Sequence, residues 1–235
     1  MTNKSFSPPQ NDFLDIWTVN LRAINLNNSA YLKQILDEAE LNRANAFKFE
    51  KDKVAFLKRR VALRRVLAHY ATSPNKKWRI ERKKMEKPRL SQSQYQFNTS
   101  NSNDYALIAV SSHDVGIDVE KIAPLEDLMS VAQTVFTQPE LDTLIVQSDE
   151  IPRQTTFYQY WSLKEAYLKG IGLGFSVNPK EVTFDLAKSQ LLKSPPQHAS
   201  TSWYFWQLQS LPGYAIAVAS TIRQPTIRTF EINSP

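Results

Sequence analysis

Cysteine is absent from this chain of 235 residues. The protein therefore has no thiolate nucleophile, no disulfide framework, no iron–sulfur cluster and no cysteine-ligated zinc site. The absence is compatible with a reducing compartment, and we expect a cytoplasmic protein. The hydrophobic content of 42% is enough to form the core of one large or two small globular domains.

Long apolar runs are also missing. Apolar stretches such as 105–110 are far shorter than the roughly 20 residues that a membrane helix needs. The first 15 residues contain proline, asparagine and glutamine but no apolar segment, so we expect no secretory signal and no membrane partner. The chain has no P-loop, no Gly-x-Gly-x-x-Gly fingerprint and no Gly-x-Ser-x-Gly elbow.

Glycine is scarce, with five residues where an average content of about 7% predicts roughly 16. Four of the five flank two motifs: Gly116 precedes Asp118, and three glycines follow the segment 161–169. We expect backbone mobility or close approach to a ligand at these positions.

Charge is unevenly distributed along the chain. The first 110 residues carry 20 basic and 10 acidic residues, whereas the rest carry 9 basic and 13 acidic residues. The first half is therefore suited to attract anions and the second to hold a cation, although a solvated surface also explains such an excess. The basic run 76–89 alone is compatible with a nucleic-acid-binding module, but the mild net charge of +6 disfavours it.

Apolar periodicity predicts an α+β chain. We expect helices over 28–47, 53–70, 125–136 and 155–169, with another beginning at Pro139. We expect strands over 104–111 and 115–120, joined as a hairpin through 112–114, and a second hairpin from 204–209 and 213–220. The segments 104–111 and 213–220 share Tyr, Ala and Ser in place, which indicates a duplicated lobe or a chance similarity of two buried strands.

Two short motifs could carry chemistry. Asp118 and Glu120 lie two apart on an expected strand, so both carboxylates project from one face and suit Mg²⁺ better than zinc. Glu165 and Lys169 lie four apart on the stripe of Trp161, among large aromatic residues. The simpler alternatives are an exposed strand face and a surface ion pair.

Five sequence blocks in order resemble the 4′-phosphopantetheinyl transferases, specifically the large two-lobed type related to the surfactin-synthetase activator. These blocks, which follow Arg43, are Lys87-Pro88, Phe97–Ser102, Gly116–Glu120, Phe136–Glu140 and Trp161–Lys169. The resemblance implies a pseudo-twofold tandem of two similar α+β lobes, with coenzyme A in the cleft between them. We place the lobes at 1–112 and 113–235.

The resemblance also implies a reaction and a set of residues. The phosphopantetheine arm of coenzyme A would pass to a serine of an apo acyl carrier protein or peptidyl carrier domain. Asp118, Glu120 and Glu165 would hold Mg²⁺. Glu165, assisted by Glu140, would accept the serine proton, and Lys169 would stabilise the leaving bisphosphate. The residues expected to bind coenzyme A are Arg43, Arg60, Arg64, Lys87, Pro88, Ser100, Asn101, Ser102 and Lys164.

The chain departs from the family pattern at several positions. Asn101 stands where the family usually has His, and Glu86 stands where Gly commonly precedes Lys-Pro. Ala55 precedes Phe56 in place of the usual Arg, for which Arg60 could compensate. We expect weaker or differently tuned coenzyme A binding, with a noncatalytic carrier-binding scaffold as the rival. Because both lobes lie in one chain, we expect a monomer. We also expect no nucleic-acid partner.

Overall fold

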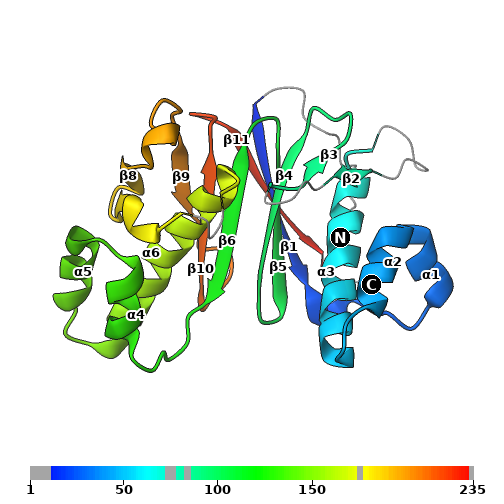
Figure 1. Ribbon diagram of the computed structural model, residues 1–235, viewed down its shortest axis with the longest axis horizontal. Helices are drawn as coiled ribbons and strands as arrows, with labels where there is room; N and C mark the ends of the chain where they lie inside the picture. Colours follow the sequence, from blue (N-terminus) through cyan, green and yellow to red (C-terminus); the bar gives the residue numbers. More distant parts are fainter. Residues whose placement is uncertain (1–11, 72–77, 82–85, 174–176, 233–235) are drawn as a thin grey trace.

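The protein is an α+β structure in which two sheets pack face to face and the long helices cover the outer faces (Figure 1). The computed structural model describes residues 12–71, 78–81, 86–173 and 177–232. Residues 76–77 and 82–85 of the basic run 76–89 lie outside these ranges. No helix in the described part of the chain is long and apolar enough to span a membrane.

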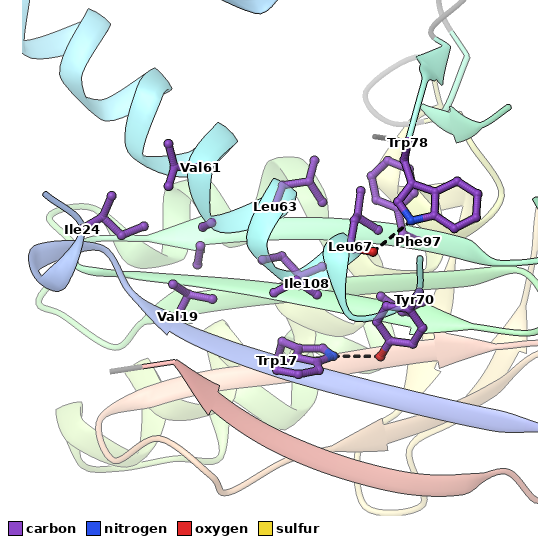
Figure 2. Packing of buried hydrophobic residues seen from close by; sticks show 14 of the residues in the cluster. Trp17, Val19, Ile24, Val61, Leu63, Leu67, Tyr70, Trp78, Phe97 and Ile108 are labelled. Carbon is purple, nitrogen blue, oxygen red and sulfur yellow. Dashed lines mark hydrogen bonds between the residues drawn. The ribbon is translucent and has the colours of Figure 1, made fainter. Parts of the chain in front are cut away.

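The N-terminal lobe contains a four-stranded sheet in the order β11-β1-β5-β4. Its strands are β1 (Phe13–Asn20), β4 (Gln96–Ser102), β5 (Tyr105–Ser111) and β11 (Thr226–Ile232), with the short pair β2 (Ile80–Glu81) and β3 (Arg89–Leu90) beside them. Its helices are η1 (Leu21–Ala23), α1 (Ser29–Ile35), α2 (Glu38–Asn45) and α3 (Glu50–Ala68). Apolar residues of α3, among them Val61, Leu63 and Leu67, pack on this sheet (Figure 2).

The C-terminal lobe contains a three-stranded sheet in the order β6-β10-β9. Its strands are β6 (Val115–Lys121), β9 (Tyr204–Gln207) and β10 (Tyr214–Ser220), with a separate hairpin of β7 (Thr183–Asp185) and β8 (Gln190–Lys193). Its helices are α4 (Leu128–Val135), α5 (Gln138–Ile145), α6 (Glu150–Gly170), η3 (Pro179–Glu181) and η4 (Pro196–His198). The buried face of α6 packs on the sheet in a second core.

The two lobes repeat one topology. In both β1-β5-β4 and β6-β10-β9, the strand that comes last in sequence, β5 or β10, lies in the centre. A long helix, α3 or α6, lies in sequence between the first and second strands of each unit. The similar segments 104–111 and 213–220 form the central strands β5 and β10. The predicted fold of two similar α+β lobes is therefore confirmed, and the hairpin of β9 and β10 is observed.

The strands β5 and β6 do not form the hairpin that the sequence suggested. The turn after Ser111 carries the chain from one sheet to the other, so β5 pairs with β1 and β4 whereas β6 pairs with β10. Side chains of β4 connect the sheets instead: Asn98 Oδ1 accepts from Ile117 N at 3.0 Å and Ser102 Oγ accepts from Lys121 N at 3.0 Å. Apolar residues facing each other across the sheets, such as Ile16, Leu107 and Val218, form the core between the lobes.

The helix expected over 28–47 is divided into α1 and α2. The chain leaves helical geometry at Leu36, and Asp37 caps α2 by accepting a hydrogen bond from Glu40 N at 2.8 Å. The Glu40 carboxylate accepts in return from Asp37 N, which completes a capping box. This cap signal fixes the start of a second helix within the apolar pattern.

The last strand crosses back to the first lobe. β11 follows the C-terminal sheet in sequence but pairs in parallel with β1, so the first and last described strands lie in one sheet (Figure 1). Arg228 of β11 binds the buried Asp15 of β1 through two hydrogen bonds of 2.7 Å. Tyr70 donates to the same carboxylate and accepts from Trp17 Nε1 at 2.8 Å (Figure 2). The lobe boundary at residue 112 remains a prediction.

Candidate active site

Strand β6 and helix α6 cross with their backbones in contact. A Cβ atom added to Gly116 would lie 1.9 Å from the carbonyl oxygen of Ala166 and 2.6 Å from Gly170 N. Only glycine allows this approach, because real Cβ atoms do not come that close to backbone. The scarce glycines at this place therefore serve helix-to-strand contact, and the contact holds the acidic end of β6 beside the last turns of α6.

Three elements from both lobes meet at Asp118. Lys169 Nζ of α6 lies 2.5 Å from Asp118 Oδ1, which also accepts from Ser100 Oγ of β4 at 2.8 Å. Lys169 Nζ lies 3.0 Å from the same serine oxygen. Asp118 is buried whereas Lys169 is partly exposed. The cluster of Ser100, Asp118, Glu120, Glu165 and Lys169 is called the junction cluster below.

Glu120 lies one pleat further along β6 and is partly buried. Its Oε2 accepts from Ser102 Oγ at 3.2 Å, so β4 contributes a second serine to the cluster. Burial and the neighbouring charge of Asp118 raise the pKa of Glu120 above its usual value. The two carboxylates of β6 therefore share one face, as their spacing predicted.

Glu165 is the most strongly perturbed carboxyl group of the cluster. Burial raises its pKa to about 7, Lys169 opposes the shift, and Asp118 and Glu120 add to it. The side chain is 4% exposed. Its Oε1 has no hydrogen-bond partner in the described structure. A carboxyl group with this pKa can exchange a proton near neutral pH.

The donor set of the junction cluster fits a hard divalent cation. Asp118 Oδ2 and Glu165 Oε1 are both buried oxygens without a partner among the described residues, and such atoms are costly unless a ligand or water binds them. Across the described ranges, however, no three Asp, Glu, His or Cys side chains already stand in a metal-binding group. Lys169 occupies Asp118 Oδ1, so a cation would have to share Asp118 with it or displace it.

A cavity of about 160 Å³ lies beside the cluster in the N-terminal lobe. It is lined by residues of α3, β4 and β5, including Arg59, Arg60, Ser100 and Asn101. Ser100 thus belongs both to the cavity wall and to the junction cluster. The structure brings together Arg60 and Asn101 here, and Arg59 was not anticipated from the sequence. Its position directly before Arg60 in a basic helix was the available signal.

The predicted arginines have partners within the N-terminal lobe. Arg60 and Arg64 both bind the buried carboxylate of Glu40. Arg64 also donates to Asp37 and to the carbonyl of Trp78, and it is only 7% exposed. Sequence reasoning missed Glu40, although its place three residues after Asp37 marks a capping box. Arg43 lies apart, with its guanidinium 5.7 Å from the centre of the Phe47 ring.

Lys87 precedes β3 in sequence, and its side chain lies beside the start of β6. It is not among the residues that line the cavity. Its Nζ donates to the carbonyl of Val115 at 2.5 Å, and burial lowers its pKa to about 8, against the opposing effect of Asp114. Pro88 follows it immediately before β3.

Glu140 and Lys164 form a closed ion pair. Lys164 Nζ lies 2.8 Å from Glu140 Oε2, and both side chains have no exposed surface. Glu140 Oε1 accepts from Phe184 N at 2.9 Å, and Oε2 also accepts from Thr137 of its capping box. Lys164 donates to two further carbonyl groups, of Pro179 and Val182. The geometry therefore encloses these two predicted site residues within the C-terminal lobe instead of adding them to the junction cluster.

Both halves of the chain match models of known protein families. Residues 26–113 match a family model described as 4′-phosphopantetheinyl transferase, N-terminal, and residues 114–219 match one described as the 4′-phosphopantetheinyl transferase superfamily. The chain is similar to the 4′-phosphopantetheinyl transferase HetI of Nostoc sp., with 35% identity over 150 residues, which are 62% of this chain and 63% of the relative.

Two further relatives extend the match. A putative 4′-phosphopantetheinyl transferase of Synechocystis sp. is 31% identical over 184 residues, which are 76% of this chain and 72% of the relative. The L-aminoadipate-semialdehyde dehydrogenase-phosphopantetheinyl transferase of Xenopus laevis is 29% identical over 160 residues, 63% of this chain and 53% of the relative. The alignments thus span between about half and three quarters of these relatives' lengths. The chain belongs to the 4′-phosphopantetheinyl transferase superfamily.

Proposed function

We propose that this protein transfers the 4′-phosphopantetheine arm of coenzyme A to a serine hydroxyl of an apo acyl carrier protein or peptidyl carrier domain. The observation that supports this reaction best is the junction cluster. It combines three carboxylates, two of them with partnerless buried oxygens, and one lysine at the meeting point of the two lobes of a family member.

Asp118, Glu120 and Glu165 would hold Mg²⁺ in this proposal. The ion, when bound, would neutralise the pyrophosphate of coenzyme A and make its β-phosphorus more susceptible to attack. The residues themselves orient the site: Ser100 and Ser102 fix the two carboxylates of β6 through hydrogen bonds of 2.8 and 3.2 Å. The two serines lie on one sheet and the two carboxylates on the other, so the geometry of the site depends on the contact between the lobes.

Glu165 is the proposed base. Its pKa of about 7 in the metal-free cluster leaves part of the population ionised at neutral pH, and a bound cation would increase the ionised fraction that can accept the proton of the attacking serine. A bond then forms between the serine oxygen and phosphorus, and the bond from phosphorus to the pyrophosphate bridging oxygen breaks. Lys169, which is partly exposed at the cluster, would stabilise the departing adenosine 3′,5′-bisphosphate. Glu140 is left out of the reaction because its carboxylate is enclosed.

The phosphate groups of coenzyme A would bind along the basic N-terminal lobe. We assign Arg60, Asn101 and Ser100 to this surface because they line one cavity beside the cluster, with Arg43 and Lys87 as flanking cations. Arg64 supports Arg60 through their common partner Glu40, and Lys164 supports α6 from within the C-terminal lobe. Asn101 can donate one hydrogen bond to a phosphate oxygen but cannot supply charge.

The partner in this proposal is the carrier protein. We further propose that the protein is cytoplasmic and monomeric. The chain without cysteine suits a reducing compartment, and both lobes of the site lie in a single chain.

The test is intact-protein mass spectrometry of apo carrier proteins incubated with coenzyme A, Mg²⁺ and the chain. The expected result is a gain of one phosphopantetheine on the carrier that requires both Mg²⁺ and Glu165, with Glu165→Gln as the inactive comparison. A chain that binds carriers of fatty-acid, polyketide and peptide synthesis but never modifies them would instead be the noncatalytic scaffold.

A further inference from the structure

A groove on the C-terminal lobe lies away from the junction cluster. It has a volume of about 610 Å³ and is lined by β8, by β9 and by the segment that leads into β9. The two strands belong to different sheets: among the described strands, β8 pairs with β7 alone and β9 with β10 alone. Within the described structure, each of the two strands therefore has an edge without a strand partner, and the groove lies along both strands.

One end of the groove is closed by side-chain contacts. Gln207 Nε2 at the end of β9 donates to the carbonyl of Leu186 at 3.2 Å and to Ser189 Oγ at 2.9 Å. These bonds fix the β7–β8 hairpin against β9 without a backbone ladder between the two edges. The groove is lined by the remaining residues of both strands, and a groove along strands suits an extended chain.

The charge of the groove has one sign. Lys188, Lys193 and Arg223 line it, and no Asp or Glu does. Lys193 and Arg223 have no ion pair within the described residues, whereas the exposed Lys188 lies 3.4 Å from Asp185. This bias occurs in the half of the chain where acidic residues outnumber basic ones by 13 to 9. A ligand that matches the groove therefore carries negative charge.

Aromatic and aliphatic side chains supply the remaining contact surface. Trp203 and Trp206 line the groove from the side of β9, and each is partly buried: Trp203 also packs against the C-terminal core and Trp206 against the core between the sheets. Leu192 lines it from β8 and is 59% exposed, which is unusual for a large apolar residue. Cations interspersed with apolar surface favour a segment in which acidic and apolar side chains alternate, as they do along a strand.

We propose that this groove binds an acidic, extended segment of a partner protein, which adds a strand to the free edge of β9. Backbone groups of the edge give the partner segment hydrogen bonds, and the two tryptophans and Leu192 receive its apolar side chains. Lys193 and Arg223 bind its carboxylates. A strand edge offers donors and acceptors at the spacing of a polypeptide backbone, so a peptide matches the groove better than a nucleic acid does.

Selection from a phage-displayed library of random nonapeptides on the full chain tests this proposal. Enriched peptides should be rich in Asp and Glu that alternate with apolar residues. The most enriched sequence, synthesised with a fluorophore, should bind at least tenfold more weakly to Lys193→Glu/Arg223→Glu than to the wild type. Lys48→Glu/Lys51→Glu, which reverses two exposed lysines around the start of α3, is the matched double charge reversal, and it should leave the affinity unchanged.

Hydrogen exchange locates the bound peptide. The amides of Tyr204–Gln207 should exchange more slowly in its presence, and a proline at the centre of the peptide should weaken binding because it removes a strand donor. Enrichment of neutral or basic peptides, equal affinity for the double variant, or protection confined to other strands would each overturn the proposal. Binding of a single-stranded DNA nonamer through Lys193 and Arg223, with no acidic peptide enriched, would overturn it as well.

Discussion

Glu165 combines burial, a partnerless oxygen and a pKa near neutrality. We expect Glu165→Gln to lower kcat for carrier modification by about 10² to 10⁴, the usual contribution of a general base. The variant should not lose stability, because the amide removes a buried charge. Steady-state kinetics and thermal melting check the two effects. Glu126→Gln, at an exposed position outside the cluster, is the control and should keep full activity.

Lys87 gives a pH-dependent signature for coenzyme A binding. Its pKa is lowered to about 8, so the side chain loses its charge as pH rises through 8. If it contacts a phosphate, the affinity for coenzyme A should fall over the same interval, since only the ammonium form attracts the anion. Calorimetric titrations between pH 7 and pH 9.5 measure this slope. Lys87→Met should bind more weakly at pH 7 and show no corresponding decrease at higher pH; an unchanged slope in that variant would contradict the assignment.

Single residues of the cluster could be identified from sequence because their signals are local. The two-residue spacing of Asp118 and Glu120 and the four-residue spacing of Glu165 and Lys169 each place both members on one face of one element. The ion-pair partners of charged residues could not be identified from the sequence. Glu40 and Glu140 are buried by tertiary contacts with distant lysines and arginines, which no local periodicity reveals.

The crossing of β6 and α6 depends on one missing side chain. Gly116→Ala places a methyl group 1.9 Å from the carbonyl of Ala166, so strand and helix must separate. We expect a destabilisation of about 3 kcal/mol or more, the upper range for overpacking, because the obstruction is backbone. Chemical denaturation measures it. Transfer activity should fall even where the protein is folded, since Lys169 moves with the helix.

Gly213→Ala is the matched control for that substitution. A Cβ there meets no atom within 4 Å, but its φ of +77° is unfavourable for alanine. The expected loss is about 1 to 2 kcal/mol with activity retained. Equal losses of activity in the two variants would show that separation of β6 from α6 is not the cause.

The ion pair between α5 and α6 is expected to hold these helices together. Lys164→Met leaves the carboxylate of Glu140 buried without its cation, and we expect a loss of about 3 to 5 kcal/mol. Adding Glu140→Gln should recover part of this loss, because the remaining group is neutral and can still accept from Phe184 N. Urea unfolding of the four combinations gives the coupling energy. If the affinity for coenzyme A fell tenfold in the folded single variant, Lys164 would instead be a ligand-binding residue.

Helices and strands with a strong apolar period were predicted well, whereas pairing across the molecule was not. The long helices α3 and α6 were both expected from apolar spacing. The division of 28–47 into two helices was missed because the cap at Asp37 lies within a continuous apolar pattern. The hairpin of β5 and β6 was wrong because a short turn between two strands can also lead from one sheet to another.

At the scale of the whole molecule, the ion pair of Arg228 and Asp15 joins β11 to β1, the last and first strands of the described structure. Arg228→Ala leaves Asp15, which has no exposed surface, with Tyr70 but without its cation. We expect a loss of about 3 to 5 kcal/mol by the same reasoning as for other buried pairs. Arg223→Ala, an exposed arginine between β10 and β11, is the control and should change stability by less than about 0.5 kcal/mol. Similar denaturation midpoints for both variants would contradict a stabilising role of the Arg228–Asp15 ion pair.

The parallel pairing of β1 with β11 also concerns how the protein is made. A ribosome delivers β1 long before β11, with the strands and helices of the C-terminal lobe in between, so one edge of β1 stays uncovered while that lobe is synthesised. That exposed edge is a potential template for incorrect pairing with another nascent chain. The N-terminal lobe can reach its final form only after the C-terminal lobe has been synthesised, and so the two lobes are expected to complete folding together instead of in sequence.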